Sequence, residues 1–238
     1  MSFSIVSGTR INRLLAALPR EIYDRLLPHF ELVSLAPQQI LHPISEPIAH
    51  VYFPVNSVIS LTNLLSDGST VEVGLVGHNG MVGVPIVLGE TLSRQSAIVQ
   101  VADRAVRLQS EILRQEFERD RSLQAFFLRY VQVLLLQMSQ LAACQRFHSI
   151  QERLARQLLL IQDALEADEF VITHECLAQM LGVRRSGITV AAGDLSRLGV
   201  IRYSRGRMKI LQRSALEAVS CECYGVIRDE CKRFFADI

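Results

Sequence analysis

The amino-acid sequence predicts an α+β fold in which an N-terminal antiparallel β-barrel is followed by one long helix and a C-terminal winged helix-turn-helix. Three observations predict it. Residues 30–110 alternate apolar and polar side chains between frequent turn residues, which is typical of short strands. Residues 120–147 are apolar over most of a helical circumference. Residues 173–211 combine two short helical patterns, a turn containing glycine and a basic β-hairpin.

The C-terminal motif is expected to contain a helix over 174–181, a tight turn at Gly182 and a second helix over 185–198. Thr173 can cap the first helix, because its hydroxyl can accept a hydrogen bond from an unpaired N–H of the first turn. Gly199 ends the second helix, and two short β-runs follow. The predicted inner faces are apolar: Leu177, Ala178 and Leu181 in the first helix, and Ile188, Ala191, Leu195 and Leu198 in the second.

Positive charge is concentrated in this motif. Residues 173–213 carry eight cations and two anions, a net charge of +6, whereas residues 1–172 carry −3 and residues 214–238 carry −2. The whole chain is close to neutral at +1. A helix-turn-helix that coincides with the basic segment indicates binding to the phosphate backbone of DNA. The alternative, a solvated basic face on an ordinary helical domain, stays open at this stage.

The bulk composition is that of a packed globular protein. The 238 residues suffice for two domains, and 49% of them are hydrophobic. The N-terminus lacks the apolar run of a secretory signal, and no segment is long and apolar enough to cross a membrane. Five cysteines, none of them before Cys144, do not form a disulfide framework. We therefore expect a cytoplasmic protein.

Two short helices are predicted over residues 9–30, with Thr9 as a cap and Pro19 in the first turn of the second helix. The candidate strands that follow are 30–35, 38–42, 48–54, 57–64, 70–76, 96–102 and 104–109. Many short strands with close turns favour a small antiparallel barrel or jelly roll. Such a barrel can hold a small ligand, although many hold only side chains.

A helix over 111–118, capped by Ser110, precedes the long helix over 120–147. A helix that is apolar on several faces must be covered on several faces. The barrel can cover one side, and the same helix of a second subunit can cover another. A central helix within a monomer is the alternative. The side chains predicted at the dimer interface are Phe127, Tyr130, Leu134, Met138 and Leu141.

The long helix is followed by a predicted hinge. Ser149 and Glu152 form a capping box, which starts a new helix over 150–165. The polar stretch 166–169 then leads into the helix-turn-helix. We divide the chain into a sensor barrel with flanking helices (1–119), the dimerisation helix (120–147), the winged helix-turn-helix (148–213) and a helical extension (214–238).

This order of elements resembles the Crp/Fnr family of bacterial transcription regulators, whose barrel is of the cyclic-nucleotide-binding type. The matching motifs are Gly77-x-x-Gly80-Met81-Val82-Gly83, Glu152-Arg153-Leu154-Ala155-Arg156 and Leu177-Ala178-x-x-Leu181-Gly182-Val183-x-Arg185. The resemblance implies a homodimer that binds a two-fold operator on double-stranded DNA. It also implies a signal sensed by the barrel and RNA polymerase as a further partner.

The resemblance places the base-reading residue at Arg185, whose guanidinium fork can span guanine O6 and N7. Ser186 and Val190 stand where the cyclic-AMP-binding members have a glutamate and a second arginine, so we expect a different half-site. Arg184, Ser186 and Thr189 are further base-reading candidates. Arg197 is as consistent with an ion pair as with DNA binding. The predicted phosphate contacts are Thr173, Arg205, Arg207 and Lys209.

The barrel departs from the cyclic-nucleotide pattern. Met81 stands where those members use a glutamate, and the run Arg94-Gln95-Ser96-Ala97 displaces the phosphate-binding arginine by one residue. Met81, Arg94, Ser96 and Ala97 therefore mark a candidate effector pocket. We expect an unidentified small molecule or no effector rather than cyclic AMP or cyclic GMP.

The sequence predicts no cofactor and no metal ligands. Without a cysteine before Cys144, the N-terminal iron–sulfur cluster of some family members is excluded. Cys221, Cys223 and Cys231 could bind a metal or form a disulfide. We expect free buried thiols, because no histidine is near them in the sequence.

An enzyme is not expected. The six histidines lack the spacing of a metal-dependent barrel enzyme, and neither a P-loop nor a nucleophile elbow is present. The alternative function is a ligand- or protein-binding regulatory module that does not bind DNA.

Overall fold

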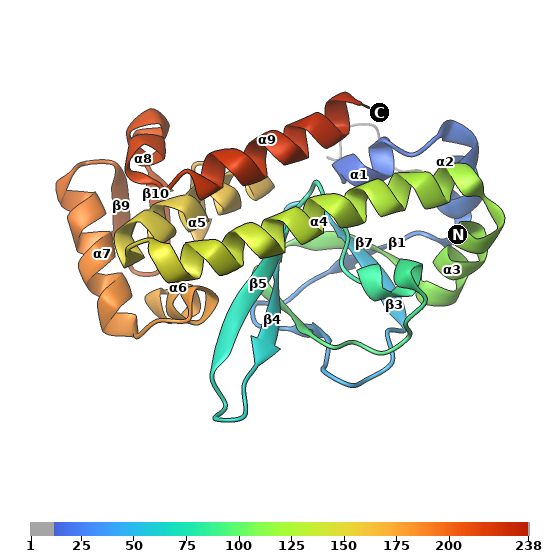
Figure 1. Ribbon diagram of the computed structural model, residues 1–238, viewed down its shortest axis with the longest axis horizontal. Helices are drawn as coiled ribbons and strands as arrows, with labels where there is room; N and C mark the ends of the chain where they lie inside the picture. Colours follow the sequence, from blue (N-terminus) through green and yellow to red (C-terminus); the bar gives the residue numbers. More distant parts are fainter. Residues whose placement is uncertain (1–11, 238) are drawn as a thin grey trace.

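The computed structural model describes residues 12–237, and its long helix α4 (Arg121–Phe147) extends along most of the molecule (Figure 1). The N-terminal sheets lie against this helix, and the helix-turn-helix lies at its C-terminal end. The predicted position of the long helix is therefore confirmed. Asp120 caps it, because the Asp120 carboxylate accepts hydrogen bonds from the N–H groups of Ser122 and Leu123.

The N-terminal helices α1 (Arg13–Ala16), α2 (Arg20–Leu26) and η1 (Leu27–His29) are anchored to the sheets through Asn12. The Asn12 side-chain amide donates to the carbonyls of Pro54 and Gly80, both at 2.9 Å. Its carbonyl oxygen caps α1. The predicted cap at Thr9 lies outside the described residues, and Pro19 is the N-cap of α2 rather than part of its first turn.

The predicted strands are all present, with ends within two residues of those expected. They are β1 (Glu31–Ser34), β2 (Ile40–His42), β3 (His50–Pro54), β4 (Val58–Leu64), β5 (Thr70–Val76), β6 (Ser96–Val101) and β7 (Arg104–Gln109). They pair antiparallel in two sheets, with orders β1-β7-β3 and β2-β6-β4-β5. The architecture is jelly-roll-like, as predicted, with the strands in two separate sheets. Ile59, Val99 and Ala105 belong to a core that both sheets share.

Two further helices flank these sheets. The short helix η2 (Val84–Leu88) follows Gly83, and α3 (Ser110–Arg119) precedes α4. The prediction that Ser110 caps this helix is wrong. Ser110 is already its first residue, and Gln109 occupies the N-cap position without a side-chain hydrogen bond.

The capping box predicted after α4 is confirmed at the start of α5 (Ile150–Leu165). The Ser149 hydroxyl accepts from the Glu152 N–H at 3.3 Å, and the Glu152 carboxylate accepts from the Ser149 N–H at 2.8 Å. Helix α5 contacts β4 of the N-terminal sheets as well as α6 (His174–Leu181) and α7 (Arg185–Arg197). Helix α6 in turn contacts β5, so both helices pack against the N-terminal sheets.

The β-hairpin predicted after the second helix of the helix-turn-helix, which we call the wing, contains one strand more than predicted. β8 (Glu169–Val171) joins β9 (Ile201–Ser204) and β10 (Arg207–Ile210) in a sheet of order β8-β10-β9. The sequence prediction treated Glu169 as part of a polar connection. Pairing with β10, at 207–209, makes this short segment a strand.

The C-terminal extension is two helices rather than one. α8 (Arg213–Val219) and α9 (Cys223–Ala236) are separated at Ser220, and α9 runs beside α4 (Figure 1). The Phe234 ring lies 5.7 Å from the Phe126 ring and 6.2 Å from the Tyr130 ring, measured between centroids. The extension thus covers part of the apolar surface of α4 within the same chain.

Candidate nucleic-acid interface

The helix-turn-helix is fixed by its caps and its apolar inner face. The Thr173 hydroxyl accepts from the Cys176 N–H at 3.1 Å, which confirms it as the cap of α6. Gly182 ends α6 with φ of 60°, in the left-handed region that glycine adopts at little cost. The predicted inner side chains are buried except Leu198, which is 57% exposed because α7 ends one residue earlier.

The predicted base-reading residues lie together at the start of α7. Arg184, Arg185, Ser186 and Thr189 are all exposed. Within residues 12–237 neither Arg184 nor Arg185 forms an ion pair, so both guanidinium groups can bind another molecule. The Thr189 hydroxyl donates to the Arg185 carbonyl at 3.1 Å, which leaves its oxygen able to accept.

The predicted phosphate-binding residues are on the wing and at the start of α6. Arg205 and Gly206 form the turn between β9 and β10 with φ of 49° and 79°, the left-handed pair that two-residue hairpin turns need. Arg205 is therefore exposed at the wing tip. Arg207 and Lys209 approach the Glu169 carboxylate at 3.7 and 3.5 Å, so one anion on β8 holds both side chains.

An imidazole joins the two helices to the wing. The His174 ring stacks on the Tyr203 ring at 4.1 Å between centroids, with 19° between the planes. Its Nδ1 lies 3.1 Å from the Thr189 hydroxyl oxygen. Burial and the nearby Arg185 charge lower the pKa of His174, which favours the neutral ring. This stack joins residues that are distant in sequence, so no local pattern predicts it.

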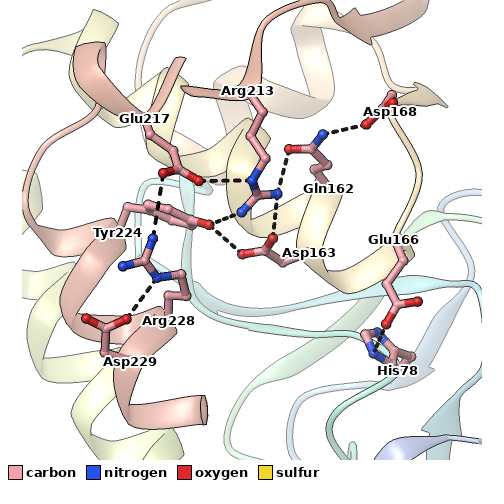
Figure 2. Close-up of polar contacts among 10 residues, drawn as sticks. All are labelled: His78, Gln162, Asp163, Glu166, Asp168, Arg213, Glu217, Tyr224, Arg228 and Asp229. Carbon is pink, nitrogen blue, oxygen red and sulfur yellow. Dashed lines mark hydrogen bonds and ion pairs between the residues drawn. The ribbon is translucent and has the colours of Figure 1, made fainter. Parts of the chain in front are cut away.

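Two cations of the basic segment outside the wing, Arg197 and Arg213, also have acidic partners. Figure 2 shows Arg213 among acidic and polar groups of α5 and α8, where it binds Asp163 at 2.8 Å and Glu217 at 2.9 Å. Arg197 pairs with Asp194 one turn earlier in α7. The charge that can reach DNA is therefore centred on the start of α7 and on the wing.

Three of the four candidate effector residues line a small cavity. Met81, Arg94 and Ala97 line a space of about 180 Å³ between the sheets and α4. Met81 is buried and its N–H donates to the Tyr130 hydroxyl at 2.8 Å, whereas the Arg94 side chain is 75% exposed and faces Glu90 at 4.0 Å. Ser96 lies on β6 outside the lining. Ligand pockets usually measure about 300–1,000 Å³, so this cavity is small for a nucleotide.

Four of the five residues predicted at the dimer interface are buried within the chain. They are Phe127, Tyr130, Leu134 and Leu141, and Met138 is half-buried. Sequence periodicity marked them as apolar but could not show that α9 and the sheets cover them. The exposed large apolar side chains on the helix are instead Leu128 and Leu135, at 51% and 55%, and Phe147 at its C-terminal end, at 78%.

The thiols are grouped differently from the sequence expectation. Cys221 and Cys223 lie beside Cys144 and His148, whereas Cys231 is elsewhere and accepts a hydrogen bond from the Asn79 amide at 3.1 Å. No histidine is near Cys221 and Cys223 in the sequence, but the fold brings His148 to them, because α9 runs back along α4. The spacing Cys144-x-x-x-His148, one helical turn, was the available signal in the sequence.

Comparisons with known proteins agree with this geometry. Residues 152–219 match the family model of the Crp-like helix-turn-helix domain. FixK2 from Bradyrhizobium japonicum has a similar structure, with a TM-score of 0.70 and 16% identity over 81% of this chain and 98% of that one. TTHB099, a transcriptional regulator of the CRP family from Thermus thermophilus, gives a TM-score of 0.66 and 18% identity, covering 79% and 96%.

A third similar structure is CLP from Xanthomonas campestris, a global regulator that responds to c-di-GMP. Its TM-score is 0.62 at 17% identity, covering 81% of this chain and 99% of that one. No curated protein sequence matches the chain significantly. Every helix within residues 12–237 is too short or too polar to span a bilayer. The chain thus has the fold of Crp/Fnr regulators and carries a Crp-like helix-turn-helix domain at 152–219.

Proposed function

We propose that this chain is a sequence-specific DNA-binding transcription regulator of the Crp/Fnr type, which binds a two-fold operator as a homodimer. The observation that carries the proposal is the start of α7. There, two arginines without ion pairs in the described chain stand exposed on a Crp-like helix-turn-helix. A helix that presents its first turn in this way can enter the major groove, where base edges are distinguishable.

Arg185 reads the base in this proposal. Its fork can donate to O6 and N7 of guanine, a contact worth about 1–3 kcal/mol of discrimination. Arg184, Ser186 and Thr189 are close enough along α7 to contact neighbouring bases. Val190 is exposed and apolar on the same face, so it can contact a thymine methyl group rather than a guanine.

The wing and the start of α6 position the protein on the phosphate backbone. Arg205 at the wing tip is the cation best placed for this contact. Arg207 and Lys209 both form ion pairs with Glu169. When either binds a phosphate, its ion pair with Glu169 must weaken or break. Thr173 lies exposed at the start of α6. Such contacts fix the register of the protein on DNA without selecting its sequence.

The homodimer forms, in this proposal, through an exposed stripe on α4 that differs from the set predicted from sequence. The stripe consists of Ala125, Leu128, Gln132, Leu135, Ser139 and Ala142. These positions alternate in steps of three and four residues, which is the seam of a two-stranded coiled coil. The small residues let two helices approach closely, and the two leucines supply apolar contact.

The N-terminal sheets are the sensor in this proposal, with an unidentified effector or none, and RNA polymerase is a further partner. The sheets directly contact the winged helix-turn-helix domain (residues 148–213), which we call the reader. A Cβ at Gly77 would lie 2.3 Å from the Ala164 Cβ of α5, and one at Gly182 would lie 3.1 Å from Val71 of β5. A displacement of β5 would therefore move α5 and α6 as well.

The test is DNA binding by fluorescence anisotropy at several salt concentrations, using a duplex chosen by selection with the purified protein. Arg185→Ala should lower affinity about 10- to 100-fold and relax selection at one base pair. Arg205→Ala should weaken binding to all sequences alike. It should also reduce the slope of log affinity against log salt concentration by about one, which corresponds to the loss of one phosphate contact. Arg119→Ala, an exposed cation on α3, is the matched control and should change neither.

The alternative function is a ligand- or protein-binding regulatory module without DNA binding. That function would be favoured if anisotropy showed no binding at low salt, or if Arg185→Ala and Arg119→Ala behaved alike.

A further inference from the structure

Three cysteines and one histidine form a compact cluster at the hinge. Cys144 belongs to the last turn of α4 and His148 is the C-cap of that helix, while Cys221 lies in the connection between α8 and α9 and Cys223 is the first residue of α9. Their ligand atoms all lie within 4.8 Å of one another. The three thiols are buried and form a core cluster of their own.

The spacing of the cluster suits a single ion. The Cys144 and Cys221 sulfurs are 3.5 Å apart, and the Cys223 sulfur is 3.5 Å from Nδ1 of His148. A tetrahedral zinc ion with Zn–S bonds of about 2.3 Å separates its sulfur ligands by about 3.8 Å. The four atoms are therefore close to the positions that such an ion requires.

The surroundings of the cluster orient its ligands. Nε2 of His148 lies 3.1 Å from the Glu222 carboxylate, which leaves Nδ1 directed at the thiols. A metal-bound histidine commonly donates its other ring N–H to a carboxylate in this way. The Gln140 amide donates to the Cys223 sulfur at 3.2 Å, a contact that stabilises a thiolate more than a thiol.

A buried cation beside the cluster lacks full compensation. Arg156 is 1% exposed, and within the described chain its Nε and Nη1 have no hydrogen-bond partner. Its charge acts on Cys144 and Cys221 as well as on the buried Glu72. Burying a guanidinium without an anion is costly. Three thiolates around one divalent ion carry a net charge of −1, which would offset this cation.

We propose that Cys144, His148, Cys221 and Cys223 bind one thiophilic divalent cation, with Zn²⁺ as the ion that best matches this ligand set. Binding forms three metal–sulfur bonds and one metal–nitrogen bond and releases three thiol protons to solvent. No electron transfer is involved. The bound ion would join the end of α4 to the α8–α9 connection, directly beside the hinge at Ser149, and would hold the reader in one orientation.

The test begins with the full-length wild-type protein, reduced and stripped of metal, titrated with Co²⁺ in the absence of oxygen. We expect one ion per chain, with the intense visible absorption of tetrahedral cobalt and a thiolate-to-cobalt charge-transfer band. Added Zn²⁺ should abolish both signals. The absence of a tetrahedral spectrum at one equivalent would overturn the proposal. So would a Cys144–Cys221 disulfide that forms with air while the reduced protein binds no metal.

Variants locate the site. Cys144→Ser and Cys223→Ser should lower the affinity for Co²⁺ at least 100-fold. Glu222→Gln should lower it about tenfold, because this carboxylate acts through His148. Cys231→Ser and Cys176→Ser, which remove thiols outside the cluster, are matched controls and should leave both spectrum and affinity unchanged. Equal losses in these controls would contradict the assignment. Because the wild-type titration stands alone, a variant that fails to fold does not prevent the test.

Discussion

Glu72→Gln tests the contact between the N-terminal sheets and the helix-turn-helix domain. Glu72 lies on β5 and is almost fully buried. Its carboxylate accepts hydrogen bonds from the Ser60 hydroxyl and, at 2.8 Å, from the Gln157 amide of α5. Burial raises the pKa of Glu72 from 4.5 to about 7, against the opposing effects of these hydrogen bonds and of Arg156. Cys176 of α6 is the other titratable group that faces it.

The sign and size of the effect follow from proton linkage. Between pH 4.5 and about 7 the unfolded chain has lost the Glu72 proton while the folded chain keeps it. Stability therefore falls as the pH rises through this range, by about 3 kcal/mol in total, and is then constant as far as Glu72 is concerned. Glutamine has the same shape and no charge, so the variant should lose this part of the pH dependence.

The assay is urea denaturation at pH 5 and pH 8, at one protein concentration. Glu72→Gln and wild type should be nearly equal in unfolding free energy at pH 5, and the variant should be more stable by up to about 3 kcal/mol at pH 8. Glu46→Gln, on an exposed loop, is the control and should leave the pH dependence of the wild type in place. A variant that is less stable than wild type at pH 8 would refute the reasoning, because the ionised carboxylate would then stabilise the fold.

Three further predictions concern the packing of the reader, its extension and the dimer. Gly77→Ala should destabilise the protein by about 1–3 kcal/mol in urea denaturation, because the new Cβ would lie 2.3 Å from that of Ala164. Tyr224→Phe should cost about 1.5–3 kcal/mol in the same assay, because the buried hydroxyl donates to Asp163 at 2.8 Å and accepts from Arg213. Leu135→Lys should raise the dimer dissociation constant at least 100-fold in sedimentation equilibrium, because it buries an ammonium group at the proposed seam.

Each of these has a matched control. Gly225→Ala in α9 meets no atom within 4 Å and should be neutral or stabilising, so equal effects at both glycines would contradict the close contact of sheet and helix. Tyr23→Phe, a half-buried tyrosine on α2, should leave stability nearly unchanged. Leu32→Lys, on an exposed position of β1, should leave the dimer intact. A wild-type protein that is monomeric in solution would contradict the proposed coiled-coil seam.

The sequence predicted what depends on near neighbours in the chain. The strands follow from apolar alternation and turn residues, and the caps at Ser149 and Thr173 follow from side chains three residues from their partners. The helix-turn-helix is of this local kind, and both its sequence pattern and its charge are contained in about forty residues. Its identification therefore did not need the fold.

The errors came from contacts between distant residues. Nothing local to α4 shows that the Phe234 ring packs beside Tyr130, a buried residue that the sequence placed at a dimer interface. The same is true of Arg213, whose partner Asp163 precedes it by fifty residues. This ion pair occupies the guanidinium group, so Arg213 does not belong to the positive charge that faces DNA. The thiol cluster also depends on the return of α9 along α4, which brings Cys223 to His148. Periodicity shows that a side chain is buried but not which element buries it.

The most direct test of the central claim is selection of genomic fragments by the purified full-length protein at increasing salt. We expect enrichment of one sequence with two-fold symmetry, in which the half-sites are about one helical turn of DNA apart and retention falls steeply with salt. We also expect that Arg185→Ala loses the preference at one position of each half-site. Retention without any enriched sequence, or no retention at low salt, would contradict the account.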